Sequence, residues 1–146
     1  MLKIHKADDI ISVNELKHQI IYQNGGIKVT VSDIQKLLNA KVLSCNEKLN
    51  MEVTNAFASD MMSDCLAFAK DANVLITGLC NPQVMRTAEL LDIECIIFIK
   101  GKETTDSMIT LAQNNGICVL MSEYRMFETA GILFKTGEIG GATVGC

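Results

Sequence analysis

The sequence predicts an α/β protein in which an open, mostly parallel (mixed) sheet lies between two layers of helices. Three short apolar segments support this prediction, because they begin 22 residues apart, near Asn73, Cys95 and Ile117. Continuous apolar strands are typical of a sheet that helices cover on both faces. Each segment precedes a stretch with helical periodicity, and repeated strand–helix units build a parallel sheet. The expected architecture is therefore a three-layer α/β sheet.

The composition is that of one globular domain. The chain has 146 residues, of which 49% are hydrophobic and 21% are charged, so disordered and collagen-like chains are excluded. Its apolar runs are far shorter than the ~18–20 residues that cross a bilayer. No signal peptide opens the chain, which favours a cytoplasmic location without membrane contact. The net charge of -4 argues against a nucleic-acid partner.

Residues 1–26 differ from the regular pattern and are expected to form an added helix or dimerisation arm. Ser12–Glu15 matches a capping box, and Asn24–Gly26 is suited to end the helix. The arm also contains both histidines of the chain, His5 and His18. The predicted helix has one apolar face, formed by Val13, Leu16, Ile20 and Ile21.

The α/β domain is expected to span residues 27–135. In its first part, Ile27–Val29 and Val42–Cys45 are predicted strands, and Glu52–Phe57 is a predicted strand with one exposed face. Two helices are predicted here. One is capped by Thr30 and buries Val31, Ile34, Leu37 and Leu38, and the other spans Ser59–Lys70 and buries Met62, Leu66 and Ala69.

Three strand–helix units follow. The predicted strands are Val74–Ile76, Cys95–Ile99 and Ile117–Met121, and the helices are Pro82–Leu91, Thr105–Asn114 and Glu123–Lys135. Residues 136–146 contain four glycines and are expected to form a flexible tail. The last helix is predicted to bury Met126, Phe127, Ala130 and Leu133.

The six cysteines do not have the spacing of a metal site. Zinc and iron–sulfur sites usually contain a close pair such as Cys-x2-Cys, and none exists here. Cysteine in an apolar segment behaves as a small hydrophobic residue. We therefore predict buried, reduced thiols and no cofactor, with a metal or cluster site and redox pairing as alternatives. The cysteines are Cys45, Cys65, Cys80, Cys95, Cys118 and Cys146.

The segment from Thr77 to Arg86 is the first candidate ligand site. In an open α/β sheet, ligands bind outside the carboxyl ends of the strands, where this segment is expected. A helix that starts after Asn81 offers unpaired amide groups and the positive end of its dipole to an anion. The alternative is a well-capped helix start with nothing bound. The candidate binding residues are Thr77, Gly78, Asn81, Gln83 and Arg86.

The segment from Ser59 to Asp64 is the second candidate. On a helix, residues four apart share a face, so Ser59 pairs with Ser63 and Asp60 with Asp64. Such a set could bind a cation, orient a polar ligand or form an acid/base pair. The alternative is helix capping by Ser59 or Asp60.

Three further positions follow predicted strands. A helix amino terminus lowers the pKa of a thiol, which draws attention to Cys80, although a catalytic role would need a histidine from the arm. Ser122 is a candidate ligand contact whose alternative role is to cap the last helix. The turn Lys100–Lys102 offers positive charge to an anion or is simply solvated.

Residues from about Ile27 to Lys135 resemble the DRTGG domain family. The resemblance rests on Val31–Ile34, Ala58–Ala67, Ile76–Ala88 and Phe127–Leu133, although the literal string Asp-Arg-Thr-Gly-Gly is absent. It implies a fold similar to the amino-terminal domain of HPr kinase/phosphorylase. Family members occur as non-catalytic regulatory modules in phosphate acetyltransferases and CBS-domain pyrophosphatases, and stand-alone versions are encoded beside iron-only hydrogenases in anaerobes.

These observations favour a non-enzymatic regulatory module that is homodimeric and senses a small anionic metabolite or nucleotide. The alternative is an accessory or interaction protein for a hydrogenase or a related redox enzyme. An electron carrier with a bound cluster is a third possibility. Catalysis ranks last, because no set of base, nucleophile or metal ligands converges in the sequence.

Overall fold

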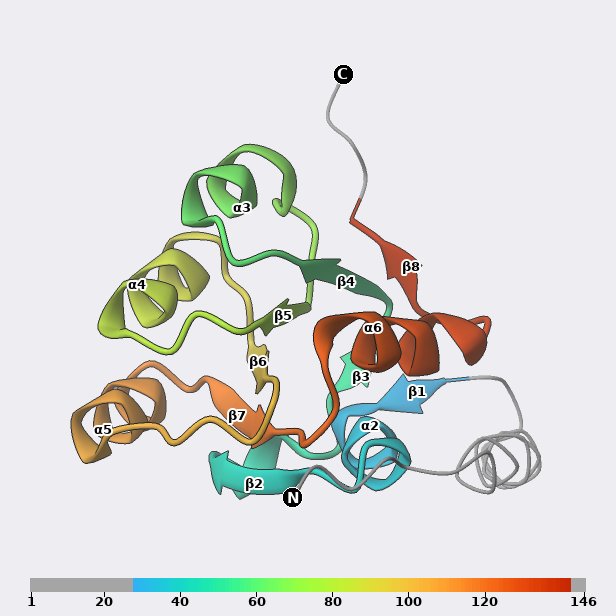
Figure 1. Ribbon diagram of the computed structural model, residues 1–146, viewed down its shortest axis with the longest axis horizontal. Coiled ribbons are helices and arrows are strands. Elements are labelled where there is room, and N and C mark those ends of the chain that lie inside the picture. The colour runs from blue at the N-terminus through green and yellow to red at the C-terminus, as the bar shows by residue number, and fades with distance from the viewer. Residues whose placement is uncertain (1–27, 143–146) are drawn as a thin grey trace.

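The computed structural model describes residues 28–142 and confirms the three-layer α/β fold (Figure 1). Six strands form the main sheet in the order β2-β7-β6-β5-β4-β8. Helices α3, α4 and α5 lie along one face of this sheet, and α2 and α6 lie along the other (Figure 1). The strands are β2 (Lys41–Ser44), β4 (Asn55–Ala58), β5 (Val74–Thr77), β6 (Cys95–Phe98), β7 (Cys118–Met121) and β8 (Gly140–Gly141). The helices are α2 (Val31–Leu37), α3 (Met62–Phe68), α4 (Pro82–Leu90), α5 (Asp106–Asn114) and α6 (Met126–Lys135).

The four central strands, β4 to β7, run parallel. Their register sets Val74 beside Cys95 and Cys95 beside Cys118. At one edge of the sheet, β2 pairs antiparallel with β7, so the sheet is mixed as predicted. Because the central strands are parallel, the loops that follow β4, β5, β6 and β7 all lie on one side of the sheet, at the carboxyl ends of the strands.

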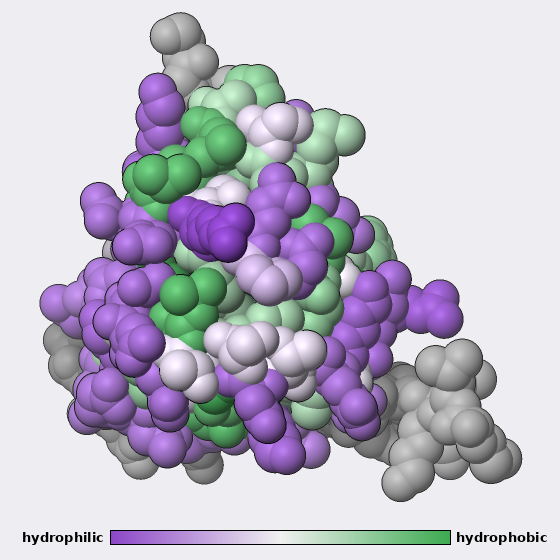
Figure 2. Space-filling model, turned by 90° about the vertical axis from the view of Figure 1, so that its left-hand side faces the viewer, coloured by the Kyte–Doolittle hydropathy of each residue, from purple (hydrophilic) through white to green (hydrophobic). Residues whose placement is uncertain are grey.

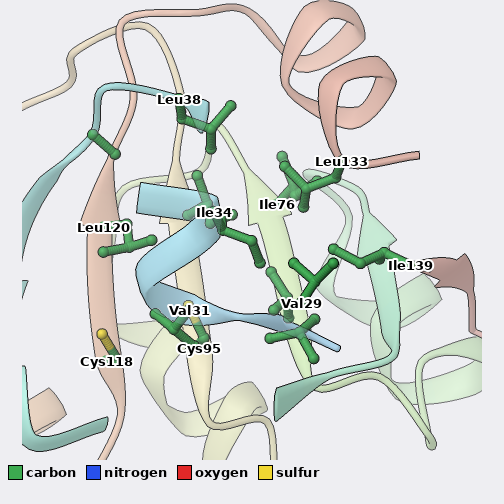
Figure 3. Close-up of a cluster of buried hydrophobic side chains, with 14 of the residues drawn as sticks. Val29, Val31, Ile34, Leu38, Ile76, Cys95, Cys118, Leu120, Leu133 and Ile139 are labelled. Atoms are coloured by element: carbon green, nitrogen blue, oxygen red, sulfur yellow. The ribbon is translucent and has the colours of Figure 1, made fainter. Parts of the chain in front are cut away.

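Alternate residues of the buried strands enter two separate hydrophobic cores. Val74, Ile76 and Ile97 pack on the side of α2 and α6, together with Val29 and Leu133 (Figure 3). On the opposite side, the helices α3, α4 and α5 pack against the other set of strand residues. That set includes Leu75, Ile96, Phe98 and Val119.

A second, two-stranded sheet corrects two strand predictions. Strand β1 (Val29–Thr30) pairs antiparallel with β3 (Glu52–Val53), so the first strand begins later than predicted. The predicted single strand Glu52–Phe57 is in fact β3 and β4, which belong to different sheets. The chain turns at Thr54, whose amide and hydroxyl both donate to the Asn73 side chain at 2.9 Å. The alternating sequence continues through the turn and therefore conceals it.

Two helices begin three residues later than predicted. Helix α3 starts at Met62 and buries Cys65 instead of Leu66, which is 44% exposed. Helix α6 starts at Met126, and this shift leaves Phe127 89% exposed, where burial was predicted. In both cases the preceding polar residues make loop contacts and do not enter the helix.

The described part of the glycine-rich tail belongs to the sheet, which corrects the prediction of a flexible end. Gly140 and Gly141 pair in parallel with β4, and Ile139 is buried. The Thr136 hydroxyl donates to the Leu133 carbonyl at 2.7 Å and so fixes the exit from α6. The predicted amino-terminal arm, 1–26, and residues 143–146 lie outside the described residues. None of the described helices is long and apolar enough to span a membrane.

Candidate functional site

The carboxyl edge of the parallel strands collects most of the predicted site residues. Ser59 and Asp60 follow β4, Thr77 ends β5 with Gly78 after it, and Ser122 follows β7. Since β5 lies next to β4 and is separated from β7 by β6, the structure brings the first two loops together. Ser122 lies two strands away from Thr77.

Asp60 connects the two loops. Its carboxylate accepts the backbone amide of Gly78 at 2.6 Å and the hydroxyl of Thr77 at 3.2 Å. The Thr77 hydroxyl in turn accepts the Leu79 amide at 3.1 Å. Charge-assisted bonds of this kind are stronger than neutral ones. The Asp60 carboxylate thus satisfies both the Gly78 amide and the Thr77 hydroxyl at this loop.

Gly78 fits this arrangement because it lacks a side chain. A Cβ atom at this position would lie 3.3 Å from the Asp60 carboxylate and 3.3 Å from the Ile99 side chain, which is tighter than ordinary contact. The carbonyl of Gly78 accepts a hydrogen bond from the Lys102 ammonium. Lys102 therefore places a positive charge at the loop, a contact that sequence reasoning had treated only as one alternative for the turn.

Helix α4 begins as predicted. Asn81 is its N-cap, and the Asn81 side chain accepts the Gln83 amide at 2.9 Å, with Pro82 in the first helical position. The side chains of Gln83 and Arg86 are exposed. Figure 2 shows the side of the molecule formed by α3, α4 and α5, whose surface mixes hydrophilic and hydrophobic residues. Arg86 is thus exposed to solvent about one turn after the start of the helix.

The second candidate segment is arranged differently from the prediction. Ser59 and Asp60 precede α3, so they do not share a helical face with Ser63 and Asp64. The N-cap of α3 is Met61 and has no side-chain cap, which excludes capping by Ser59 or Asp60. The Ser59 hydroxyl instead accepts the Met61 amide at 3.0 Å. Ser63 is exposed and Asp64 is half-buried on α3. Neither residue takes part in the contact between Asp60 and Gly78.

Ser122 supports the neighbouring turn and does not cap α6. Its buried hydroxyl accepts the Tyr124 amide at 3.2 Å, and its carbonyl accepts the Gly101 amide at 2.8 Å. The N-cap of α6 is Arg125. Both Lys100 and Gly101 have positive φ, so these bonds hold a strained turn and, with it, the adjacent Lys102.

The environment of Cys80 does not favour the thiolate form. Burial raises the pKa of Cys80, and the nearby Lys102 charge only partly opposes this effect. The thiol donates to the Glu103 carbonyl at 3.2 Å. The pKa of Cys80 is therefore raised, in the opposite direction from the lowering expected at a helix terminus.

Four other cysteines are buried free thiols, as predicted. They are Cys45, Cys65, Cys95 and Cys118, whereas Cys146 lies outside the described residues. Cys95 and Cys118 are register partners on neighbouring strands, and the interaction of Cys95 with the Cys118 thiol raises the pKa of Cys95. Across residues 28–142, no group of three His, Cys, Asp or Glu side chains is placed to hold a metal ion.

An apolar groove was missed by sequence reasoning. It lies between α6 and strands β4 and β8, has a volume of about 330 Å³, and is bordered by Phe127 and Phe134. A signal was available in Phe134, an aromatic residue outside the predicted buried face of the last helix. Predicting the groove would also have required knowledge of β8, whose glycines line it.

The comparisons with known proteins agree with this fold. The chain is similar to the crystal structure of the CBS and DRTGG domains of the regulatory region of Clostridium perfringens pyrophosphatase, complexed with the activator diadenosine tetraphosphate. The similarity has a TM-score of 0.58 at 15% identity, and it covers 88% of this chain and 56% of that one. No curated protein matches significantly. The profile of the DRTGG domain matches residues 33–136, so this chain belongs to the DRTGG domain family.

Proposed function

We propose that this protein is a non-enzymatic regulatory module that binds a small anionic metabolite or a nucleotide at the loops after β4 and β5. The observation that carries the proposal is the Asp60 carboxylate on the amide of Gly78, because a group that holds one carboxylate is suited to hold a phosphate. The similar pyrophosphatase region, complexed with diadenosine tetraphosphate, supports a ligand of the nucleotide class.

Binding would exchange one anion for another. A ligand phosphate takes the Gly78 amide and the Thr77 hydroxyl, and like-charge repulsion expels the Asp60 carboxylate from them. Lys102, which already contacts this loop, and the exposed Arg86 supply positive charge to the ligand. The released segment between β4 and α3 then changes position, which gives the module a means to report the ligand to a partner.

A thermal-shift panel tests the proposal. Diadenosine tetraphosphate, mononucleotides, phosphate esters and coenzyme A derivatives are added to the full chain, and a binder raises the melting temperature. Lys102→Ala and Arg86→Ala are expected to weaken a hit at least fivefold, whereas Lys36→Ala, an exposed cation on α2, leaves it unchanged. A panel without hits, or a hit that survives Arg86→Ala and Lys102→Ala, contradicts the proposed site.

We further propose that the protein acts in the cytoplasm as a homodimer, as befits a module that transmits a signal. Light scattering coupled to size exclusion tests the oligomeric state, and a monomer at micromolar concentration contradicts it.

The second candidate function is that of an accessory protein for a hydrogenase or related redox enzyme. Exposed apolar side chains on the α3–α4 side favour this function, because such groups serve as docking contacts. They include Leu66, Phe68 and Leu90. Titration of the purified protein into an iron-only hydrogenase, followed by calorimetry, decides between the two functions, and the absence of binding excludes this partner.

A further inference from the structure

One part of the main sheet is open on the α6 side. Helix α6 contacts β5, and the neighbouring strands β4 and β8 form the floor of the apolar groove on this face. The floor carries small side chains, Ala56 and Ala58, and the glycines of β8. Phe127 and Phe134 stand along the groove and are 89% and 71% exposed. An apolar sheet face of this kind is normally covered by another element.

The amino terminus of the described chain starts next to this groove. Val29 lies in the same core cluster as Leu133 and Ile139, and both of these residues also line the groove (Figure 3). Five residues, 24–28, separate the end of the predicted helix from Val29. Five extended residues span about 17 Å, and this is the reach that the preceding segment has from Val29.

The sequence before Val29 has the chemistry that the groove requires. The predicted helix has an apolar stripe at Val13, Leu16 and Ile20, so its first and last members are seven residues apart. Phe127 and Phe134 are also seven residues apart, on α6. On helices, both intervals correspond to two turns, about 10 Å, so the spacing of the stripe matches that of Phe127 and Phe134.

We propose that residues 12–23 of the same chain pack as a helix in this groove, with the stripe against Phe127 and Phe134. The amino-terminal segment then completes the helical layer on the α6 side. This proposal is independent of the ligand site, which lies in the loops after β4 and β5.

A double-mutant cycle in the full chain tests the contact. Leu16→Ala, Phe134→Ala and the double variant are unfolded in urea at two protein concentrations a hundredfold apart. If the two side chains touch, the increases in the unfolding constant are non-additive by about threefold or more. Both variants are expected to fold, because Phe134 is exposed in the described domain and is not part of either core.

The control pair is Leu16→Ala with Leu90→Ala, because Leu90 is 74% exposed on α4, across the sheet from the groove. This pair is expected to be additive within about twofold at both concentrations. Non-additivity between Leu16 and Phe134 at both concentrations supports the proposal. Additivity overturns it, and so does coupling that disappears on dilution, which would assign the groove to a second copy of the chain.

Discussion

The carboxylate of Asp60 bonds to the amide of Gly78 across two neighbouring loops, 18 residues apart in the sequence. The contact ties the end of β4 to the end of β5 at the edge where ligands of α/β proteins bind. Under the proposed function, an anionic ligand would displace the Asp60 carboxylate from this amide. The first two predictions concern this contact.

Asp60→Asn is expected to raise the affinity for an anionic ligand about tenfold and to lower stability only slightly. The amide oxygen of asparagine can still accept from Gly78, whereas the negative charge that repels the ligand is gone. Calorimetric titration with the best ligand of the thermal-shift panel measures the affinity. Asp64→Asn on α3 is the matched control, and equal gains for both variants would show that only the net charge matters.

Gly78→Ala is expected to lower the free energy of unfolding by about 1–3 kcal/mol. The new methyl group would press on the Asp60 carboxylate and on Ile99, each 3.3 Å from the Cβ position. Urea unfolding measures the loss. Gly101→Ala is the comparison, because its cost of about 1 kcal/mol comes from a positive φ, while the Glu123 side chain in its way can swing aside. If Gly78→Ala leaves the free energy of unfolding unchanged, the loop can move to accommodate the methyl group.

Ser44→Ala is expected to lower the free energy of unfolding by about 1–3 kcal/mol. The buried hydroxyl donates to the Ile117 carbonyl at 2.8 Å and accepts the Val119 amide at 3.0 Å, where the register of β2 and β7 is irregular. Alanine would leave the buried Val119 amide without this hydrogen-bond acceptor. Ser63→Ala, at an exposed position of α3, should change stability by less than about 0.5 kcal/mol.

Stability is expected to fall as the pH rises above about 9. Burial raises the pKa of Cys45 and Cys65 above their usual value of 9.0, so the unfolded thiols lose protons before the folded ones do. The unfolded state then binds fewer protons, and the free energy of unfolding decreases with pH. Urea unfolding at pH 7.5 and pH 10 measures the slope.

Cys65→Ala provides the control for this pH dependence. The substitution removes one of the thiols with a raised pKa, so the decrease in stability between pH 7.5 and pH 10 should be smaller than in the parent chain. An unchanged decrease would show that other groups, such as lysines, cause it.

The sequence predicted the elements whose signals are local. Buried strands such as Val74–Thr77 have continuous apolar residues, and the start of α4 carries its cap in Asn81 and Pro82. Elements that depend on distant contacts were missed. The two glycines of β8 have no side-chain pattern and become a strand only because β4 offers a free edge.

The same distinction holds for the candidate site. The N-cap at Asn81 and the position of the loops at one edge of the sheet follow from local sequence and from topology rules. The bond between Asp60 and Gly78 depends on which strands are neighbours and on where α3 begins. A helix that begins three residues late changes which side chain faces the loop, and propensity does not resolve boundaries so finely.

Cys95 and Cys118 lie beside each other in the register of β6 and β7, and the access of oxidants to their thiols differs between the unfolded and the folded chain. Once the sheet has closed, both thiols are sealed between two helical layers, and a solution oxidant cannot reach them. During synthesis or refolding the same thiols are open to any oxidant. Reducing conditions during folding would therefore keep both thiols reduced, and burial protects them afterwards.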